Sequence, residues 1–275
     1  MHPKSCFLLV AGLLVSMGAA AQQRETFPGG AALLPEAQLE IALSGNDYLL
    51  TSFSLVGATR RYSTLGVEFG QFRVGYEHFW TDHWSGGATV RYVPQGNQGN
   101  GELLGLPGIV TPGVLVRHLG KVGPISLGQR LGLEYALGNN LVGESQFYNR
   151  ALVRLRLDAE HVFALNKIAL RPRLAYEAAA YLRLQRNEEQ LKERVIDFGS
   201  LRAEVGGRLS PYFDVTPWVA YQTAYRNSLP FFDAQGNQVS GGKVNYVTPA
   251  VGLDLRLTVG ANAAAAERQA LPTQH

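Results

Sequence analysis

The sequence predicts an all-β protein, a single antiparallel up-and-down transmembrane β-barrel of about ten strands. Three observations lead to this prediction. Apolar and polar residues alternate with period two over segments of about 10 to 17 residues, longer than the strands of most soluble sheets. The connections between these segments alternate between short and long, and aromatic residues gather near the segment ends. Short turns at one end, longer loops at the other and aromatic girdles at both interfaces are typical of an outer-membrane barrel.

The composition excludes several classes of protein. The 275 residues are 46% hydrophobic and 17% charged, which is too apolar for a disordered chain. The net charge is only +3 and no basic run accompanies it, so no nucleic-acid partner is expected. Cys6 is the only cysteine and lies in a segment that we expect to be removed, so disulfides, thiol catalysis and thiolate metal sites are not expected.

Residues 1–21 have the pattern of a secretory signal peptide. A polar start that includes Lys4 precedes the apolar run FLLVAGLLV, and AAA at 19–21 forms a cleavage site before Gln22. The apolar run is too short to cross a bilayer as a helix. We therefore expect an exported protein in which residues 22–48 form a lead-in. Within it, residues 37–44 also alternate and are either a continuation of the first strand or an additional strand.

The barrel domain is expected over residues 49–259, followed by a disordered, alanine-rich tail at 260–275. Both termini are expected on the periplasmic side. The alternation slips near Gly70, where a glycine bulge explains it; a tight turn at Gly70–Gln71 would instead raise the strand number to twelve. The expected strands are 49–58, 64–80, 84–93, 109–119, 125–137, 147–163, 168–184, 199–209, 214–226 and 244–258.

The clearest hairpin spans residues 150–184. Charged residues occupy even positions before the ALNK turn and odd positions after it. A turn centred on Leu165–Asn166 brings residues of opposite charge face to face across the two strands. Directly opposed unlike charges favour a register, each by a few tenths to about 1 kcal/mol. The opposed pairs in this register are Arg154–Glu177, Asp158–Arg173 and Glu160–Arg171.

The charged face of the strands is expected to point into the lumen as a network of ion pairs. Barrels of about eight strands are just filled by side chains, so about ten strands favour a plugged lumen over an open pore. A narrow, weakly ion-selective channel for small solutes is the alternative. The lumen residues are Arg154, Glu177, Asp158, Arg173, Glu160, Arg171, Arg202, Glu204, Arg208, Asp254 and Arg256, and the same face carries Arg73, Glu77, Arg91, Arg130, Glu134 and Arg156. The aromatic girdle is expected at Trp80, Trp84, Tyr92, Phe163, Tyr212, Phe213, Tyr225 and Tyr246.

The last expected strand, AVGLDLRLTV, carries Gly252 followed by alternating leucines. Together with the export signal, it resembles the terminal strand of Gram-negative outer-membrane β-barrels. The segments YNRALVRLRLDAEHVF, YEAAAYLRL and LRAEVGGRLSPYFDVTPWVAY resemble an uncharacterised family of small outer-membrane barrels common in Bacteroidetes. The resemblance implies a location in the outer membrane, contact with its lipid and insertion by the assembly machinery that reads the terminal strand. It implies no particular activity.

Catalytic and metal-binding patterns are weak. Asp82 lies beside His83 in a short turn with no partner serine, and His78, His118 and His161 are isolated on or next to the apolar face. No enzymatic activity, cofactor or metal is therefore expected. The sequence favours a non-enzymatic outer-membrane barrel of unknown specific activity, whose loops contact an unknown external ligand. A hydrolase at the outer rim and a soluble periplasmic β-sandwich are the remaining alternatives.

Overall fold

The computed structural model describes residues 25–28, 30–43, 47–58, 66–93, 104–106, 108–138, 149–165, 168–182, 194–235 and 238–260. The predicted signal peptide and residues 261–275 of the predicted tail lie outside this part of the chain. No helix in the described ranges has the length and apolar character needed to cross a membrane.

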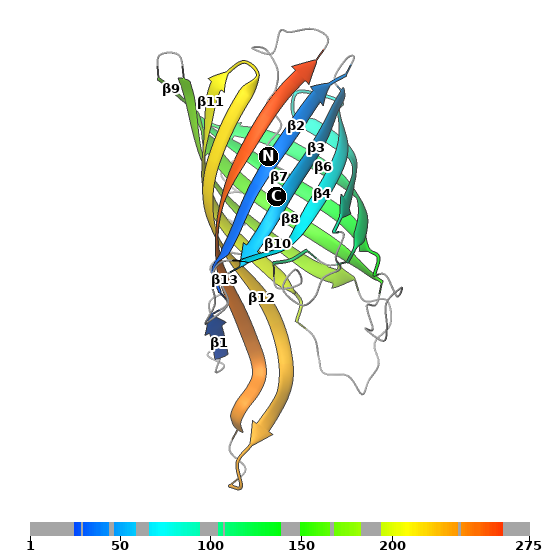
Figure 1. Cartoon of the computed structure of the whole chain (residues 1–275), viewed down its shortest axis with the longest axis vertical. Helices are drawn as coiled ribbons and strands as arrows, with labels where there is room; N and C mark the ends of the chain where they lie inside the picture. The colour runs from blue at the N-terminus through cyan, green and yellow to red at the C-terminus, as the bar shows by residue number, and fades with distance from the viewer. Residues whose placement is uncertain are drawn as a thin grey trace, which may run out of the picture.

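The described residues form a closed β-barrel (Figure 1). Eleven strands make the wall: β2 to β8 and β10 to β13 pair in sequence order, and β13 returns to pair with β2. The short strand β9 pairs with β10, and β1 pairs with β13. The all-β barrel fold is therefore confirmed, and the β-sandwich alternative is wrong. The strands are β1 (Glu25–Pro28), β2 (Ala32–Ala42), β3 (Asp47–Ala58), β4 (Gly66–Phe79), β5 (Trp84–Tyr92), β6 (Val110–Val122), β7 (Ile125–Ala136), β8 (Arg150–His161), β9 (Phe163–Leu165), β10 (Ile168–Leu182), β11 (Phe198–Ser210), β12 (Phe213–Phe232) and β13 (Gln238–Gly260).

The wall differs from the expected one in strand number and direction. Residues 22–48 are not only a lead-in, because β2 is a complete wall strand and the barrel begins at Ala32 rather than near residue 49. β2 pairs with β13 in parallel, with Ala32 opposite Ala250 and Ala42 opposite Gly260, whereas the other described wall pairs are antiparallel. With an odd number of strands, the first strand starts at one end of the barrel and the last strand finishes at the other. Ala32 and Gly260 therefore lie at opposite ends of the barrel, whereas an even number of strands would place them at the same end; the predicted positions of the two chain termini lie outside the described residues.

Strand β4 is continuous, so the turn at Gly70 that would give twelve strands does not form. The pairing with β3 shifts where Val56 faces Phe69 and Gly57 faces Val67, which leaves one extra residue in β4. Such a β-bulge reverses the side-chain alternation. Val67 is accordingly 71% exposed, whereas Phe69 is 7% exposed and faces the lumen.

The β8–β10 hairpin is shifted by two residues from the predicted register. Glu160 lies opposite Arg173 and Arg156 lies opposite Glu177, in line with the pairing of Leu165 with Ile168 at the end of the hairpin. A shift of two residues keeps every side chain on its original face of the sheet. The alternation therefore predicted which residues face the lumen but not which ones are directly opposed.

The two ends of the barrel differ, as the connection lengths predicted. Short connections join β4 to β5, β6 to β7 and β11 to β12 at one end, which we call the short-turn end. The longer connections between β5 and β6, β7 and β8, and β10 and β11 lie at the other, the long-connection end. Residues 227–243, expected as a loop, are mostly strand, because β12 continues to Phe232 and β13 starts at Gln238. This hairpin extends beyond the wall at the long-connection end, at the bottom of Figure 1.

The outward face of the wall is apolar. Between the two rims, the described outward positions carry no Asp, Glu, Lys or Arg; Asp47 lies at the short-turn rim, where it hydrogen-bonds with Tyr76 and His78. Exposed apolar side chains cover strands all around the wall. They include Leu33, Phe53, Phe72, Val90, Val114, Leu131, Leu133, Leu155, Leu157, Leu174, Leu201, Val205, Val219, Val251, Leu253, Leu255 and Leu257.

Candidate functional site

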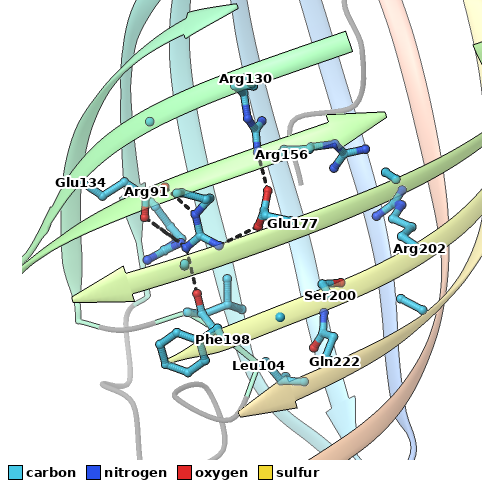
Figure 2. Close-up of a pocket in the computed structure, with 18 of the residues that line it drawn as sticks. Arg91, Leu104, Arg130, Glu134, Arg156, Glu177, Phe198, Ser200, Arg202 and Gln222 are labelled. Carbon is cyan, nitrogen blue, oxygen red and sulfur yellow. Dashed lines mark hydrogen bonds and ion pairs between the residues drawn. The ribbon is translucent and has the colours of Figure 1, made fainter. Parts of the chain in front are cut away.

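The lumen is the candidate site, and Arg154 of β8 organises its centre. Its Nε donates to Glu134 Oε1 at 3.0 Å, and its Nη1 donates to Glu177 Oε1 at 2.7 Å. Arg130 Nη2 donates to the second oxygen of Glu177 at 2.7 Å, and Figure 2 shows Arg130 directed at this carboxylate. Glu177 thus bridges two guanidinium groups. Charge-assisted hydrogen bonds of this kind are about twice as strong as those between neutral groups.

A second group of residues links β11, β12 and β13. Arg202 donates to Glu204 Oε2 at 2.6 Å and to Asp254 Oδ2 at 2.7 Å. The Trp218 indole donates to the other oxygen of Asp254 at 2.8 Å, and the Arg202 guanidinium lies 4.0 Å from the centre of the Trp218 ring. Burial of Asp254 is compatible with its charge because both of its oxygens are hydrogen-bonded.

The half of the lumen nearer the short-turn end holds further pairs. Arg173 contacts Glu160 and donates to Glu204 at 2.8 Å, and Arg208 donates to Asp214 at 3.0 Å. Arg256 Nε donates to Gln38 Oε1 at 2.8 Å, across the parallel seam between β13 and β2.

Arg117 and Glu77 form a deeply buried ion pair in the lumen. Their N and O atoms are 2.7 Å apart, and the side chains are 3% and 1% exposed. Ser85 Oγ also donates to Glu77. Removal of one partner of such a pair leaves an uncompensated charge, which costs about 3–5 kcal/mol.

The sequence placed its lumen residues on the inward face, and the structure brings most of them together. Arg154 contacts Glu177 although the two are not directly opposed. Asp158 lies 3.9 Å from Arg173, and Glu160 forms an ion pair with Arg173 rather than with Arg171. Arg171 instead lines a small pocket of about 30 Å³ near the short-turn end, together with Arg208, Asp214 and Arg256.

Sequence reasoning missed several charged members of the lumen. Glu36 and Glu40 belong to β2, which was expected to be lead-in, and both are buried. Arg117 follows an alternation in which Val114 and Val116 point outward, so its parity was a usable signal. Asp214 near the β11–β12 turn follows the same kind of alternation, because the apolar Phe213 and Val215 flank it on the other parity.

The predicted girdle residues divide into two groups. Exposed on the outer surface are Trp80, Trp84, Phe163 and Tyr212 at the short-turn end and Tyr92 at the long-connection end. Phe213, Tyr225 and Tyr246 are half-buried instead. Tyr246 packs against an apolar cluster of the lumen that contains Leu152 and Phe198.

The histidines near the short-turn end make local contacts. His83 Nδ1 is 3.0 Å from the Leu119 carbonyl oxygen, and the His118 ring packs 4.6 Å from that of Trp84. Both lie at the end opposite the long connections. Within the described residues, no group of three or more His, Cys, Asp or Glu side chains is arranged to hold a metal ion.

Apolar clusters lie toward both ends of the lumen. At the short-turn end, Tyr48 and Phe79 pack edge to face with ring centres 5.4 Å apart. Toward the long-connection end, Leu104 from the β5–β6 connection packs into a cluster with Val56 and Trp218. The Gly105 carbonyl next to it accepts a hydrogen bond of 3.1 Å from Arg154. Leu104 and Gly105 are thereby held inside the barrel.

Between the central ion pairs and Leu104 lies a cavity of about 110 Å³ (Figure 2). Its wall combines arginines of β4, β5, β7, β8 and β11 with Glu134 and Glu177, and with Phe198, Ser200 and Gln222.

Comparison of the chain with protein-family models and with curated proteins finds no match.

Proposed function

We propose that the protein resides in the outer membrane of a Gram-negative bacterium, as a non-enzymatic barrel whose lumen is plugged by its own side chains. Its outward face contacts the lipid, and the outer-membrane assembly machinery inserts it. Membership of the small-barrel family common in Bacteroidetes is part of the same proposal. The long connections and the β12–β13 hairpin are the parts available to an external ligand.

The apolar outward face carries this proposal. Soluble proteins rarely expose contiguous apolar patches larger than a few hundred Å². Here the apolar face encircles the barrel, while the charged residues point inward. A closed barrel satisfies its backbone hydrogen bonds within the sheet, which the hydrocarbon core of a membrane requires. The 12 residues of β7 and the 13 residues of β11 also exceed the 9 to 11 that a tilted strand needs to cross.

The lumen supports a plugged barrel over a channel. Buried ion pairs occupy its centre beside a cavity of only about 110 Å³, and the clusters around Phe79 and Leu104 lie toward its two ends. Moving an ion through such a lumen would require breaking charge-assisted hydrogen bonds between buried groups.

The test has two parts. The full chain is expressed in a Gram-negative host, and the separated envelope fractions are run on a gel with and without boiling. The protein is expected in the outer-membrane fraction, with a mobility that changes only on heating. Recovery in soluble form would contradict the membrane location.

The gel-shifted protein is then reconstituted into a planar bilayer. No stepwise conductance above that of the bare bilayer is expected. Discrete steps whose selectivity changes on substitution of Arg154→Gln would contradict the plugged lumen and establish the channel instead.

A further inference from the structure

A short piece of the β5–β6 connection lies inside the lumen in the way that a bound peptide would. The Leu104 side chain is 9% exposed and packs with Val56 and Trp218 in the apolar cluster toward the long-connection end. We call this cluster without Leu104 the recess. The next carbonyl along the chain, that of Gly105, accepts a hydrogen bond of 3.1 Å from Arg154 Nη2. The segment thus presents an aliphatic side chain to the recess and a backbone carbonyl to a guanidinium group.

The backbone of residues 104–106 also fits this place. Gly105 has a φ angle of 70°, in the left-handed region that favours glycine. A Cβ atom at this position would lie 3.6 Å from the Phe198 ring, so the backbone here runs close to the aromatic side chain. Leu106 packs against the recess as well. Three consecutive residues, with the sequence Leu-Gly-Leu, are therefore accommodated by the lumen.

Two glutamine side chains beside this segment are suited to hydrogen bonds with a peptide. Gln71 and Gln222 line the cavity of about 110 Å³, which Leu104 and Gly105 also border. Gln71 is only 4% exposed, and the side-chain oxygens of both glutamines have no hydrogen-bond partner among the described residues. Buried polar groups are normally hydrogen-bonded, so a partner inside the cavity is expected. A peptide group has one donor and one acceptor, which match the two ends of a glutamine amide. Figure 2 shows Gln222 and Leu104 on the same side of the cavity.

We propose that the recess and the cavity together form a binding site for a short peptide with aliphatic side chains, which residues 104–106 occupy as an internal ligand. A bound peptide places an aliphatic side chain in the recess, a carbonyl at Arg154 and further peptide groups at the two glutamines. The cavity has the volume of roughly three or four water molecules, and withdrawal of Leu104 adds the space of a leucine side chain. The inference depends on the barrel interior and not on the membrane location.

Residues 104–106 compete with any free peptide for this site. Burial of Leu104 and the hydrogen bond from Arg154 favour the inserted segment, but ordering a connection costs conformational entropy that offsets part of the gain. A tethered segment also has a high effective concentration at its own site. The apparent affinity for a free peptide is therefore the intrinsic affinity reduced by the fraction of molecules whose site is vacant. Weakening the inserted segment should tighten the binding of a free peptide, which a purely structural role of the segment does not predict.

The test is calorimetric titration of the full, folded chain with the acetylated and amidated tripeptide Leu-Gly-Leu, which repeats residues 104–106. The chain is held in phospholipid nanodiscs if it fractionates with the membrane, and in buffer otherwise. Leu104→Ala removes most of the side chain that fills the recess and should bind the tripeptide at least about tenfold more tightly than the original chain. Gly105→Ala strains the left-handed backbone, so it should act in the same direction and serves if Leu104→Ala does not fold.

Three comparisons locate the site. Leu119→Ala is the matched control, because Leu119 packs against the apolar cluster of Tyr48 and Phe79 at the short-turn end, and its affinity should stay within about twofold of the original. Gln222→Leu, added to Leu104→Ala, should weaken binding roughly fivefold through the loss of a hydrogen bond at the cavity. The tripeptide Ser-Gly-Ser, which has no aliphatic side chain for the recess, should bind at least about tenfold more weakly than Leu-Gly-Leu.

Three results would overturn the inference. These are folded Leu104→Ala and Gly105→Ala proteins that bind Leu-Gly-Leu no more tightly than the original chain, an equal gain in Leu119→Ala, and equal binding of Ser-Gly-Ser. The gel shift, the fractionation and the conductance are separate measurements. A non-conducting outer-membrane barrel that fails the titrations defeats this inference alone, and a soluble or conducting protein that passes them defeats only the proposed function.

Discussion

Substitution of Leu131 by arginine tests whether the outward face lies in hydrocarbon. Leu131 is 54% exposed at the middle of β7, and Ile125 begins the same strand at the short-turn end, opposite His161. Both side chains point outward, and both variants add the same charge to the same strand. Ile125→Arg is therefore a control that differs from Leu131→Arg only in depth.

The depth follows from strand geometry. The step from Ile125 to Leu131 covers roughly 20 Å along the strand at about 3.3 Å per residue. With a tilt of about 40°, this is about 15 Å along the barrel axis, or half the hydrocarbon thickness of a bilayer. Arginine on the lipid face of a barrel costs about 2–4 kcal/mol at the midplane and about 0–1 kcal/mol near the interface. Leu131→Arg should therefore shift the folding equilibrium roughly 30- to 150-fold further than Ile125→Arg.

The assay is urea unfolding in phospholipid vesicles, with the folded fraction taken from the mobility of unboiled samples. The difference between the two variants isolates the depth term from any local effect of arginine on the strand. Equal costs for the two variants, or no cost for Leu131→Arg, would refute the reasoning that places this face in lipid.

Three further predictions concern the lumen, the seam and the direction of the strands. Glu77→Gln should destabilise the barrel by about 3–5 kcal/mol in urea unfolding, because it leaves the buried Arg117 without its carboxylate partner. The double variant Glu77→Gln/Arg117→Met should recover part of this loss. Gly252→Ala should lower the free energy of unfolding by about 1–3 kcal/mol, because the added Cβ would lie 2.5 Å from the backbone oxygen of Leu34 in β2. Gly132→Ala is the control: the nearest atom to its added Cβ lies at 3.7 Å, so this variant should be close to neutral in the same assay. An epitope inserted beside Ala31 should bind antibody on intact cells, because β2 starts at the long-connection end. An epitope placed after Gly260 should bind antibody only after the outer membrane is permeabilised. Antibody binding to both epitopes on intact cells would contradict the strand directions.

Alternation was sufficient to predict the two faces of most strands. In β8 and β10 the charged residues occupy every second position, and side chains on a strand necessarily alternate between faces. This fixed the inward direction of residues such as Arg154 and Glu177 independently of register. The register itself was predicted wrongly, because a shift of two residues preserves the faces and Arg173 has a carboxylate within reach in either case.

The seam and the cavity were beyond sequence reasoning for a different physical reason. β2 is part of the wall because it pairs with β13, which lies at the far end of the chain. No local sequence pattern predicts that a strand has a parallel partner. The cavity likewise depends on residues of nine strands and on Leu104 from a connection. Glu36 in β2 remained unassigned because its strand had no recognised neighbour.

The parallel seam also determines the order in which the barrel can form. Each antiparallel hairpin joins segments that are close in sequence, whereas the seam contact between Arg256 and Gln38 spans 218 residues. Loop-closure entropy grows by about 0.6 kcal/mol per doubling, so this contact costs about 2–3 kcal/mol more to close than a hairpin. Before β13 pairs with β2, one edge of β2 presents unpaired backbone N–H and C=O groups that can pair with another chain. We therefore expect the seam to form after the hairpins, so that the free edges of β2 and β13 need protection from other chains until they pair.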